Sequence, residues 1–134
     1  MQLRRFDAPD PLQYEAVFAQ MAARRQEAVA ITEEATFIAQ ASTLAALAQQ
    51  RRVPSVVDKE FAQVGGLIGY GANREAIFRR ATGMADKPLR GTKPADLPEE
   101  QPTEFELVLN ARAAQAIGLA LPAALRLRAD DVID

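Results

Sequence analysis

The sequence predicts an α/β domain in which helices cover both faces of a parallel β-sheet. Three observations favour this class. Apolar runs of strand length alternate with amphipathic helical stretches, the loops between them are short, and 134 residues are enough for one core. No internal repeat or low-complexity tract interrupts the alternation, so we expect one structural unit.

The first elements follow from apolar spacing. Residues 3–6 suit a short strand, and the turn residues that follow lead into a helix over residues 11–25. The apolar residues of this helix fall at i, i+3, i+4 and i+7: Tyr14, Val17, Phe18 and Met21. The β-branched run 28–31 predicts a strand that is buried on both faces.

The middle of the chain continues the alternation. We expect a helix over residues 34–51, a strand at 53–57, a helical turn at 59–64 and a strand at 67–70. A third long helix opens after Gly71, Ala72 and Asn73, and its predicted core face consists of Ile77, Phe78 and Ala81. Gly83 and Pro88 disfavour a helix interior, so this helix should break or kink before Pro88.

The regular alternation of strands and helices ends in the last third of the chain. Three prolines make residues 92–103 a loop or an extended crossing segment. Alternation predicts a strand at 105–109, and a short helix over 111–117 should stop at Gly118. The remaining expected features are one or two helical turns at 122–129 and a terminal apolar tag, Val132 and Ile133.

Composition excludes most catalytic chemistry. The chain has no Cys and no His, so it offers no thiol nucleophile, imidazole base, disulfide or ordinary zinc site. We therefore expect neither an enzyme nor a metal or cofactor. The acid pairs Glu33–Glu34, Glu99–Glu100 and Asp130–Asp131 are interpreted as solvated side chains, because adjacent helical residues do not face each other.

Charge and hydropathy exclude two kinds of partner. A net charge of −2 gives no electrostatic reason to expect nucleic acid. The Arg24–Arg25 and Arg51–Arg52 pairs are interpreted as cations at helix ends, where they complement the helix dipole. The longest uncharged stretch, residues 35–50, is too short and too polar to insert into a membrane.

The second half carries an ordered string of motifs. GLIGYGAN (66–73), IFRRA (77–81), RGTKPADLP (90–98) and QPTEFELVLN (101–110) precede AIGL (116–119) and Pro122. This string resembles the C-terminal part of ABC-transporter substrate-binding proteins related to the tryptophan- and tyrosine-binding lipoproteins. The resemblance is strong from about residue 65 onward. Over the first 64 residues it rests on the order of strands and helices.

The resemblance implies a type I periplasmic-binding-protein fold, in which two α/β lobes close on a small ligand. Family members are at least twice this long, so the chain resembles a truncated form that lacks the N-terminal lobe. By this analogy residues 1–64 are a lobe segment and residues 65–103 are a returning strand and helix with a Pro-rich crossing loop. Residues 104–134 supply the C-terminal strand and short helices.

The implied function is solute binding for an ABC uptake transporter, with an amino acid or other small organic molecule as ligand and an ABC permease as partner. Exposed apolar faces and sheet edges also lead us to expect a homodimer. The family location is periplasmic, but no export signal is recognisable from Met1, which implies a cytoplasmic protein if Met1 is the true start. The alternative is a cytosolic ligand-sensing or interaction domain.

Two segments are candidate ligand sites because each follows a strand and begins a helix. In the first, Tyr70 would stack on a ligand while Gly71 and Asn73 present backbone and amide groups. The alternative is a turn glycine and an Asn helix cap. In the second, Thr32 and Glu33 would contact the ligand; alternatively, Thr32 caps a helix with acidic residues in its first turn.

Overall fold

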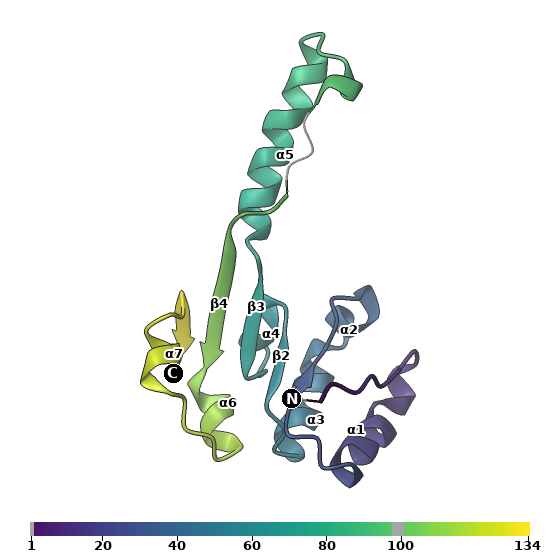
Figure 1. Ribbon diagram of the computed structural model, residues 1–134, viewed down its shortest axis with the longest axis vertical. Coiled ribbons are helices and arrows are strands. Elements are labelled where there is room, and N and C mark those ends of the chain that lie inside the picture. Colours follow the sequence, from purple (N-terminus) through teal and green to yellow (C-terminus); the bar gives the residue numbers. More distant parts are fainter. Residues whose placement is uncertain (1, 98–100) are drawn as a thin grey trace.

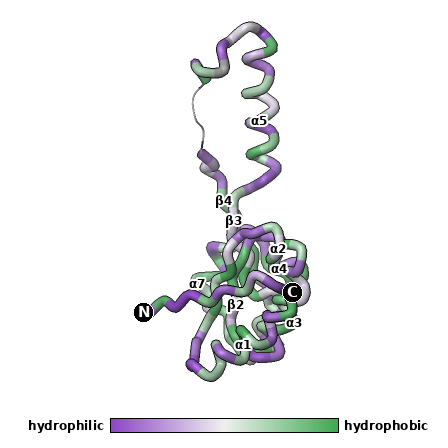
Figure 2. The backbone as a smooth tube through the Cα atoms, turned by 90° about the vertical axis from the view of Figure 1, so that its right-hand side faces the viewer, coloured by the Kyte–Doolittle hydropathy of each residue, from purple (hydrophilic) through white to green (hydrophobic). Residues whose placement is uncertain are grey.

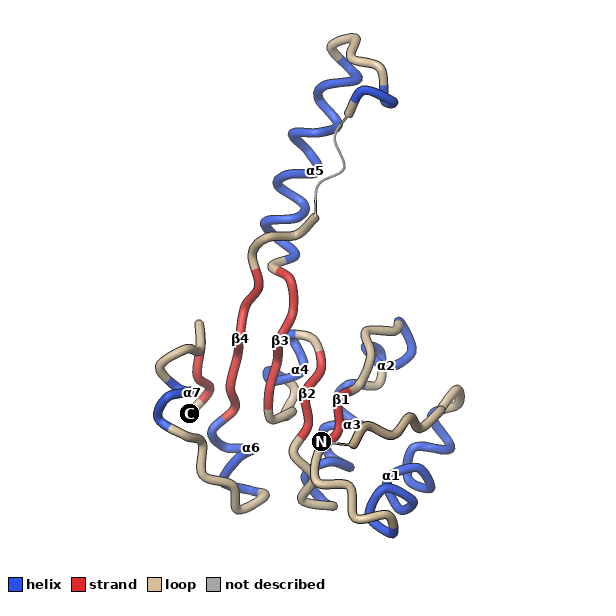
Figure 3. The backbone as a smooth tube through the Cα atoms, in the orientation of Figure 1, coloured by secondary structure: helices blue, strands red, loops and turns tan. Residues whose placement is uncertain are grey.

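A five-stranded sheet organises the protein, whose computed structural model describes residues 2–97 and 101–134. The Glu99–Glu100 pair lies outside these residues. The strands lie side by side in chain order: β1 (Val29–Ala30), β2 (Ser55–Val57), β3 (Ile68–Ala72), β4 (Phe105–Asn110) and β5 (Asp131–Ile133) (Figure 3). The predicted α/β class and its strand–helix alternation are confirmed.

The sheet is mostly parallel. β1, β2 and β3 run parallel to one another, as predicted, and β5 runs parallel to β4. β4 is antiparallel to β3, with Gly71 opposite Glu106, so a fully parallel sheet is wrong. The reason is that the chain leaves the sheet at the end of β3 and returns at the same end (Figure 1).

Seven helices accompany the sheet in the described residues, with 3-10 turns at Pro11–Gln13 and Pro94–Asp96. They are α1 (Tyr14–Ala23), α2 (Ala35–Ala39), α3 (Ala41–Gln50), α4 (Lys59–Gln63), α5 (Arg74–Leu89), α6 (Ala111–Ala116) and α7 (Ala123–Arg126). Most predicted helices are confirmed within a few residues. The expected helix over 34–51 is two helices, because Gln40 leaves the helical region at φ −107° and ψ 18°.

The main core lies between one face of the sheet and the helices α1, α3 and α4. Its largest fully buried side chains include Tyr14 and Phe61, which pack with Phe18, Leu44 and Val57. A Cβ at Gly69 would lie 2.3 Å from the carbonyl oxygen of Lys59. The close approach of α4 to β3 therefore requires glycine at this position.

The opposite face of the sheet is covered unevenly. Leu109 points to this face and is fully buried, whereas Ala30 and Tyr70 on the same face are exposed. The strand predicted at 28–31 is therefore not buried on both faces. It is an edge strand, and only Val29 and Ile31 pack against the main core.

The ends of the chain differ from the prediction in opposite ways. Residues 2–9 form no strand, and Leu3 is 84% exposed, because no neighbouring strand pairs with this segment. The apolar tag at Val132 and Ile133 belongs to strand β5, which pairs with Leu109 and Asn110 of β4. Pairing partners, which local sequence does not show, decided both outcomes.

Helix α5 projects from the sheet as an arm, carried by the ends of β3 and β4 (Figures 1 and 2). The predicted core face is wrong: Phe78 is 71% exposed, Ala81 is exposed and Ile77 is only partly buried. Ala76 is the buried residue of this helix. The apolar side of this helix is thus only partly covered in the described chain, with Phe78 and Leu89 exposed.

The predicted break before Pro88 is also wrong, because α5 continues to Leu89. Pro88 lies in the last turn of the helix, where its missing N–H removes a single intrahelical hydrogen bond. The helix ends just beyond it, and Arg90 donates its N–H to the carbonyl oxygens of Asp86 and Lys87 at 3.1 Å.

The interpretation of two Arg pairs as helix ends is confirmed. Arg24 and Arg51 are the C-cap residues of α1 and α3, and Arg25 and Arg52 follow them with positive φ angles of 53° and 54°. In each case the next N–H donates to a carbonyl five residues back, which closes the helix end.

Candidate ligand-binding site

The carboxyl ends of the three parallel strands bring polar residues to one edge of the sheet. Thr32 and Glu33 follow β1, Asp58 follows β2, and Asn73 follows β3. In open α/β sheets, ligands bind outside this end of the strands. The edge also lies at the base of the α5 arm (Figure 1).

Asp58 is the buried acid of this edge, with its side chain only 5% exposed. Its Oδ2 lies 3.2 Å from Nη2 of Arg74, the first residue of α5. A buried carboxylate needs such a partner because desolvation would otherwise penalise its charge. The ion pair therefore ties the start of the arm to the end of β2.

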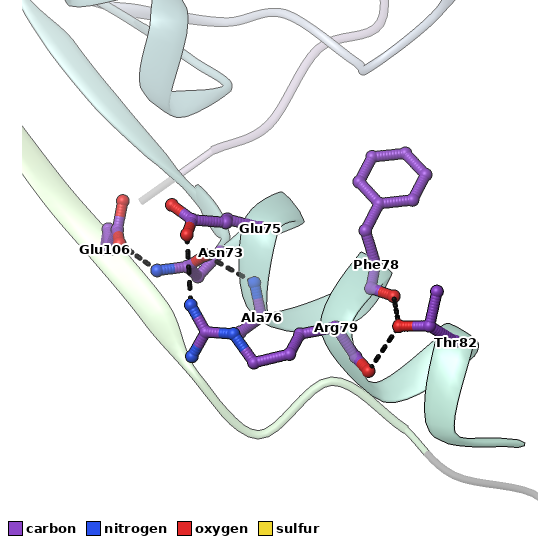
Figure 4. Close-up of polar contacts among 7 residues, drawn as sticks. All are labelled: Asn73, Glu75, Ala76, Phe78, Arg79, Thr82 and Glu106. Atoms are coloured by element: carbon purple, nitrogen blue, oxygen red, sulfur yellow. Dashed lines mark hydrogen bonds and ion pairs between the residues drawn. The ribbon is translucent and has the colours of Figure 1, made fainter.

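Glu106 of β4 joins three elements. One carboxylate oxygen accepts a hydrogen bond from Lys59 Nζ of α4 at 2.5 Å. The other oxygen accepts from the Asn73 side-chain amide (Figure 4). Both charged side chains of the ion pair are less than one third exposed. The hydrogen bond from Lys59 to Glu106 raises the pKa of the lysine above its usual value.

Asn73 has a structural role at the start of α5. Its Oδ1 accepts a hydrogen bond from the N–H of Ala76 at 2.8 Å, which is the helix cap that the sequence offered as an alternative (Figure 4). Its amide nitrogen donates to Glu106. Both polar ends of the Asn73 side chain thus have protein partners.

Glu33 and Gly71 lie next to each other although they come from different strands. A Cβ at Gly71 would be 3.4 Å from Glu33 Oε1 and 3.5 Å from the backbone nitrogen of Lys59. The Glu33 carboxylate forms no ion pair within residues 2–97 and 101–134. The structure therefore brings Glu33, Gly71 and Asn73 to the same edge.

Tyr70 points to the other face of the sheet, because it is opposite Leu107 rather than Glu106. Tyr70 is 53% exposed, and its ring stacks on that of Phe105, with ring centroids 5.8 Å apart and an angle of 17° between the planes. Tyr70 is thus separated by the sheet from Glu33 and Gly71.

Thr32 lines a different feature, a cavity of about 690 Å³ between residues 2–9, α1 and β1. The expectation that Thr32 caps the next helix is wrong: Glu34 holds the N-cap position, and Thr32 Oγ1 lies 3.4 Å from its carboxylate. The cavity wall is mostly apolar, with Phe18, Met21 and Phe37 among its residues.

Tyr14 also lines this cavity wall, and its buried hydroxyl has no hydrogen-bond partner among the described residues. Burial raises the pKa of the phenol, and the nearby carboxylates of Asp10 and Glu34 raise it further. Charged residues line the cavity as well, namely Arg4, Arg5, Asp7 and Glu34.

Four residues of this edge were not predicted as site residues: Asp58, Lys59, Arg74 and Glu106. Asp58 and Lys59 follow β2 as Thr32 and Glu33 follow β1, so the rule that nominated Glu33 would also have found them. Glu106 gave no such signal, because it lies inside a strand and meets Lys59 only through the antiparallel pairing of β4.

In the described part of the chain, no cluster of acidic, His or Cys side chains is placed to hold a metal ion. No described helix is long and apolar enough to cross a membrane.

Comparison with known proteins points to one family. The sequence profile of the family described as "ABC transporter substrate binding protein" matches residues 1–133. No curated protein matches the chain.

Solved structures share the fold. A conserved domain protein from Vibrio cholerae aligns with a TM-score of 0.82 and 18% identity, over 93% of this chain and 42% of its own. An ABC domain from Streptococcus pneumonia in complex with L-Trp aligns with a TM-score of 0.80 and 22% identity, over 94% of this chain and 44% of its own.

A third structure, the ligand-free, open form of the substrate-binding protein CD0873 from Clostridium difficile, aligns with a TM-score of 0.69 and 15% identity. The alignment covers 94% of this chain and 42% of that one. The chain thus spans less than half the length of the proteins whose fold it shares.

Proposed function

The chain belongs to the family of ABC transporter substrate-binding proteins, whose profile matches residues 1–133, and from this we propose that it binds a small organic solute for uptake through an ABC permease. The solute class that we propose is amino acids, because a structural relative was solved in complex with L-Trp. Binding requires no chemical step, which agrees with a chain that has no His and no Cys.

The observation that carries the proposal is the position of Glu33 beside Gly71 at the carboxyl ends of the strands. Among the carboxylates of this edge, Asp58 and Glu106 already have basic partners, whereas Glu33 has none in the described residues. A carboxylate beside a residue without a side chain leaves room for a cationic group. We therefore propose that Glu33 accepts hydrogen bonds from the ammonium group of the solute.

The rest of the edge supports this subsite by holding it in place. The Asp58–Arg74 and Lys59–Glu106 pairs connect β2, α4, β4 and α5 around Gly71. A rigid frame lowers the entropy that ligand binding would otherwise cost. Asn73 belongs to this frame, and ligand contacts of Thr32 and Tyr70 remain predictions.

The mechanism that we propose is capture followed by closure against a second wall. The edge described here is one wall, and a buried small ligand usually loses most of its surface to the protein. Ligand binding would then shift the population toward a closed form that the permease recognises. The periplasm is the location that this role requires.

The direct test is calorimetric titration and thermal unfolding of the chain with L-Trp, L-Tyr, other amino acids and their des-amino analogues. A ligand at 100 times its Kd should stabilise the fold by about 2.7 kcal/mol. We expect saturable stabilisation by an amino acid and none by the analogue that lacks the ammonium group. Absence of binding by every solute at millimolar concentration would contradict the proposal.

The residue assignment is tested with Glu33→Gln, which keeps the shape and removes the charge. We expect at least tenfold weaker binding, whereas Glu15→Gln on the exposed side of α1 should bind as the unmodified chain does. Equal affinity in both variants would exclude Glu33 from the subsite. Binding without any effect on solute uptake in cells would instead favour a sensing role.

A further inference from the structure

The cavity between residues 2–9, α1 and β1 has the size of a ligand pocket. Its volume of about 690 Å³ lies within the range of roughly 300–1,000 Å³ that is typical of small-molecule sites. All of its lining residues lie between positions 2 and 44, so β3, β4 and the α5 arm do not contribute. The arm and α1 lie at opposite ends of the molecule (Figures 1 and 2). Neither Glu33 nor Gly71 lines the cavity, which is therefore distinct from the subsite proposed above.

The inner wall of the cavity is apolar. Most of its buried and partly buried side chains are aliphatic or aromatic, and they include Val17, Phe18, Met21, Val29, Ile31 and Phe37. Gln26 is a half-buried polar exception, and its amide already donates to the carbonyl oxygen of Arg24 at 3.0 Å. Aromatic rings and a flexible thioether pack well against a flat apolar ligand.

The charged side chains of the cavity lie at its mouth. Arg4, Arg5, Asp7 and Glu34 are all exposed to solvent. Arg5 Nε is already paired with Asp7 Oδ1 at 2.7 Å. Two basic and two acidic side chains give the mouth no net charge, so it favours neither an anion nor a cation. The apolar wall behind the mouth would penalise a charge of either sign.

Tyr14 places one unsatisfied hydrogen-bonding group in this wall. The residue is 1% exposed, and its hydroxyl forms no hydrogen bond to any described residue. Because burial and the carboxylates of Asp10 and Glu34 raise the pKa of the phenol, the hydroxyl keeps its proton at neutral pH and can act as a donor. A buried donor without an acceptor is unfavourable, and a ligand can supply the acceptor.

The outer wall of the cavity, residues 2–9, can move without loss of backbone pairing. No backbone hydrogen bond joins this segment to the rest of the described chain. Side chains hold it instead: the Arg24 guanidinium lies 5.7 Å from the centroid of the Phe6 ring, and Ala8 packs against the main core. Displacement of the segment therefore gives a ligand access to the inner wall and to Tyr14.

We propose that this cavity is a second binding site, which takes a small neutral molecule with a ring-shaped apolar body and one hydroxyl or carbonyl oxygen. The body would pack against Phe18, Met21 and Phe37, and the oxygen would accept a hydrogen bond from Tyr14. A wall with a single free donor and no charge matches a ligand with a single acceptor and no charge. The inference does not depend on the solute proposed for the strand ends.

The test is calorimetric titration of the chain with four ligands that share a benzene ring. Benzyl alcohol carries an acceptor oxygen, toluene lacks it, and benzoate and benzylamine carry opposite charges. We expect one saturable site per chain for benzyl alcohol and weaker binding of the other three ligands. No saturable binding of benzyl alcohol at millimolar concentration would overturn the proposal. Tighter binding of either charged ligand would also overturn it.

The hydrogen bond is tested by a cycle that combines Tyr14→Phe with benzyl alcohol and toluene. The variant keeps the ring and removes the donor. We expect about fivefold weaker binding of benzyl alcohol and unchanged binding of toluene. Equal changes in affinity for the two ligands would exclude the hydroxyl from the site. Circular dichroism checks that the variant is folded.

The location is tested with Ala28→Trp, which adds bulk at an exposed position of the cavity lining. We expect at least about tenfold weaker binding of benzyl alcohol, because the indole occupies part of the cavity. The matched control is Ala19→Trp, at an exposed position of α1 outside the lining, which should bind as the unmodified chain does. Equal affinities of the two variants would place the ligand elsewhere and overturn the proposal.

Glu33→Gln separates this cavity from the subsite at the strand ends. The variant removes the carboxylate that we propose for solute binding, so its affinity for benzyl alcohol should equal that of the unmodified chain. The charged ligands are compared in this variant, which prevents benzylamine from binding at Glu33. Loss of benzyl alcohol binding in Glu33→Gln would assign the ligand to the strand ends and overturn the second site.

Discussion

Lys59 and Glu106 form an ion pair with 2.5 Å between Nζ and Oε2, although 47 positions separate them in the sequence. Lys59 begins α4 on one face of the sheet, and Glu106 reaches that face from β4. Glu106 also accepts a hydrogen bond from Asn73. This contact connects the lobe to the strand that returns from the α5 arm.

The first prediction concerns the loss of this connection. Glu106→Ala leaves the Lys59 ammonium and the Asn73 amide without their acceptor, and we expect the free energy of unfolding to fall by about 2–3 kcal/mol. Urea unfolding measures the change. Glu75→Ala, which removes the exposed partner of Arg79, should change stability by no more than about 0.5 kcal/mol. Equal losses of stability in the two variants would show that Glu106 contributes no more than the partner of an exposed ion pair.

Removal of the Tyr14 hydroxyl should not destabilise the protein. This buried group has no described hydrogen-bond partner, so it contributes a desolvation cost without a compensating bond. We expect Tyr14→Phe to raise the free energy of unfolding by about 1 kcal/mol at pH 7. A loss of stability in urea unfolding would mean that the hydroxyl has a partner in solution.

Stability should fall at alkaline pH. The pKa values of Tyr14 and Lys59 are raised in the folded protein above the ordinary 10.0 and 10.5, so both groups hold their protons more tightly than in the unfolded chain. Their stabilising effect is complete below these ordinary values and is lost as pH rises through the folded pKa. We expect Tyr14→Phe and Glu106→Gln each to reduce the loss of unfolding free energy between pH 9 and 12. A loss of unchanged size in either variant would mean that the corresponding group, Tyr14 or Lys59, does not cause it.

Gly69 and Gly83 should respond in opposite ways to alanine. A Cβ at Gly69 would lie 2.3 Å from the Lys59 carbonyl oxygen, so Gly69→Ala should cost about 2–3 kcal/mol. Gly83 lies in the interior of α5 with free space around it, so Gly83→Ala should stabilise the helix by up to about 1 kcal/mol. Thermal unfolding should show a lower melting temperature for Gly69→Ala and a higher one for Gly83→Ala than for the unmodified chain.

Asn110 performs two tasks at once. Its Oδ1 caps α6 by accepting from the N–H of Ala113 at 2.8 Å, and its Nδ2 donates to the carbonyl oxygen of Ala62 at 2.8 Å. Asn110→Ala loses both bonds in a buried position and should cost about 3 kcal/mol. Asn110→Ser keeps a cap acceptor, so it should recover part of that loss. Equal losses in urea unfolding would assign the whole effect to the bond with Ala62.

Local chemistry made several features predictable. The i, i+3, i+4, i+7 spacing placed α1 and its buried residues Tyr14, Phe18 and Met21, and Asn73 was recognised as a possible cap of the third long helix. The interpretation of Arg24 and Arg51 as helix ends was equally local. Each of these features depends on residues within one or two helical turns.

The candidate site was only partly predictable, for a reason visible in Tyr70 and Gly71. They are neighbours in the motif, but a strand points successive side chains to opposite faces, so Gly71 meets Glu33 and Tyr70 stacks on Phe105. Which face would carry the polar edge depended on the side occupied by α4. No residue within β3 reveals that side.

By itself, the sequence determined the α/β class, the order of strands and helices, and membership of the substrate-binding family, because periodicity, turn residues and motifs are properties of neighbouring residues. Only the tertiary structure decided which contacts these elements make. It turned β4 antiparallel, paired Lys59 with Glu106, and left Phe78 of α5 uncovered. Apolar spacing identifies a face that needs burial, but the partner that buries it comes from elsewhere in space.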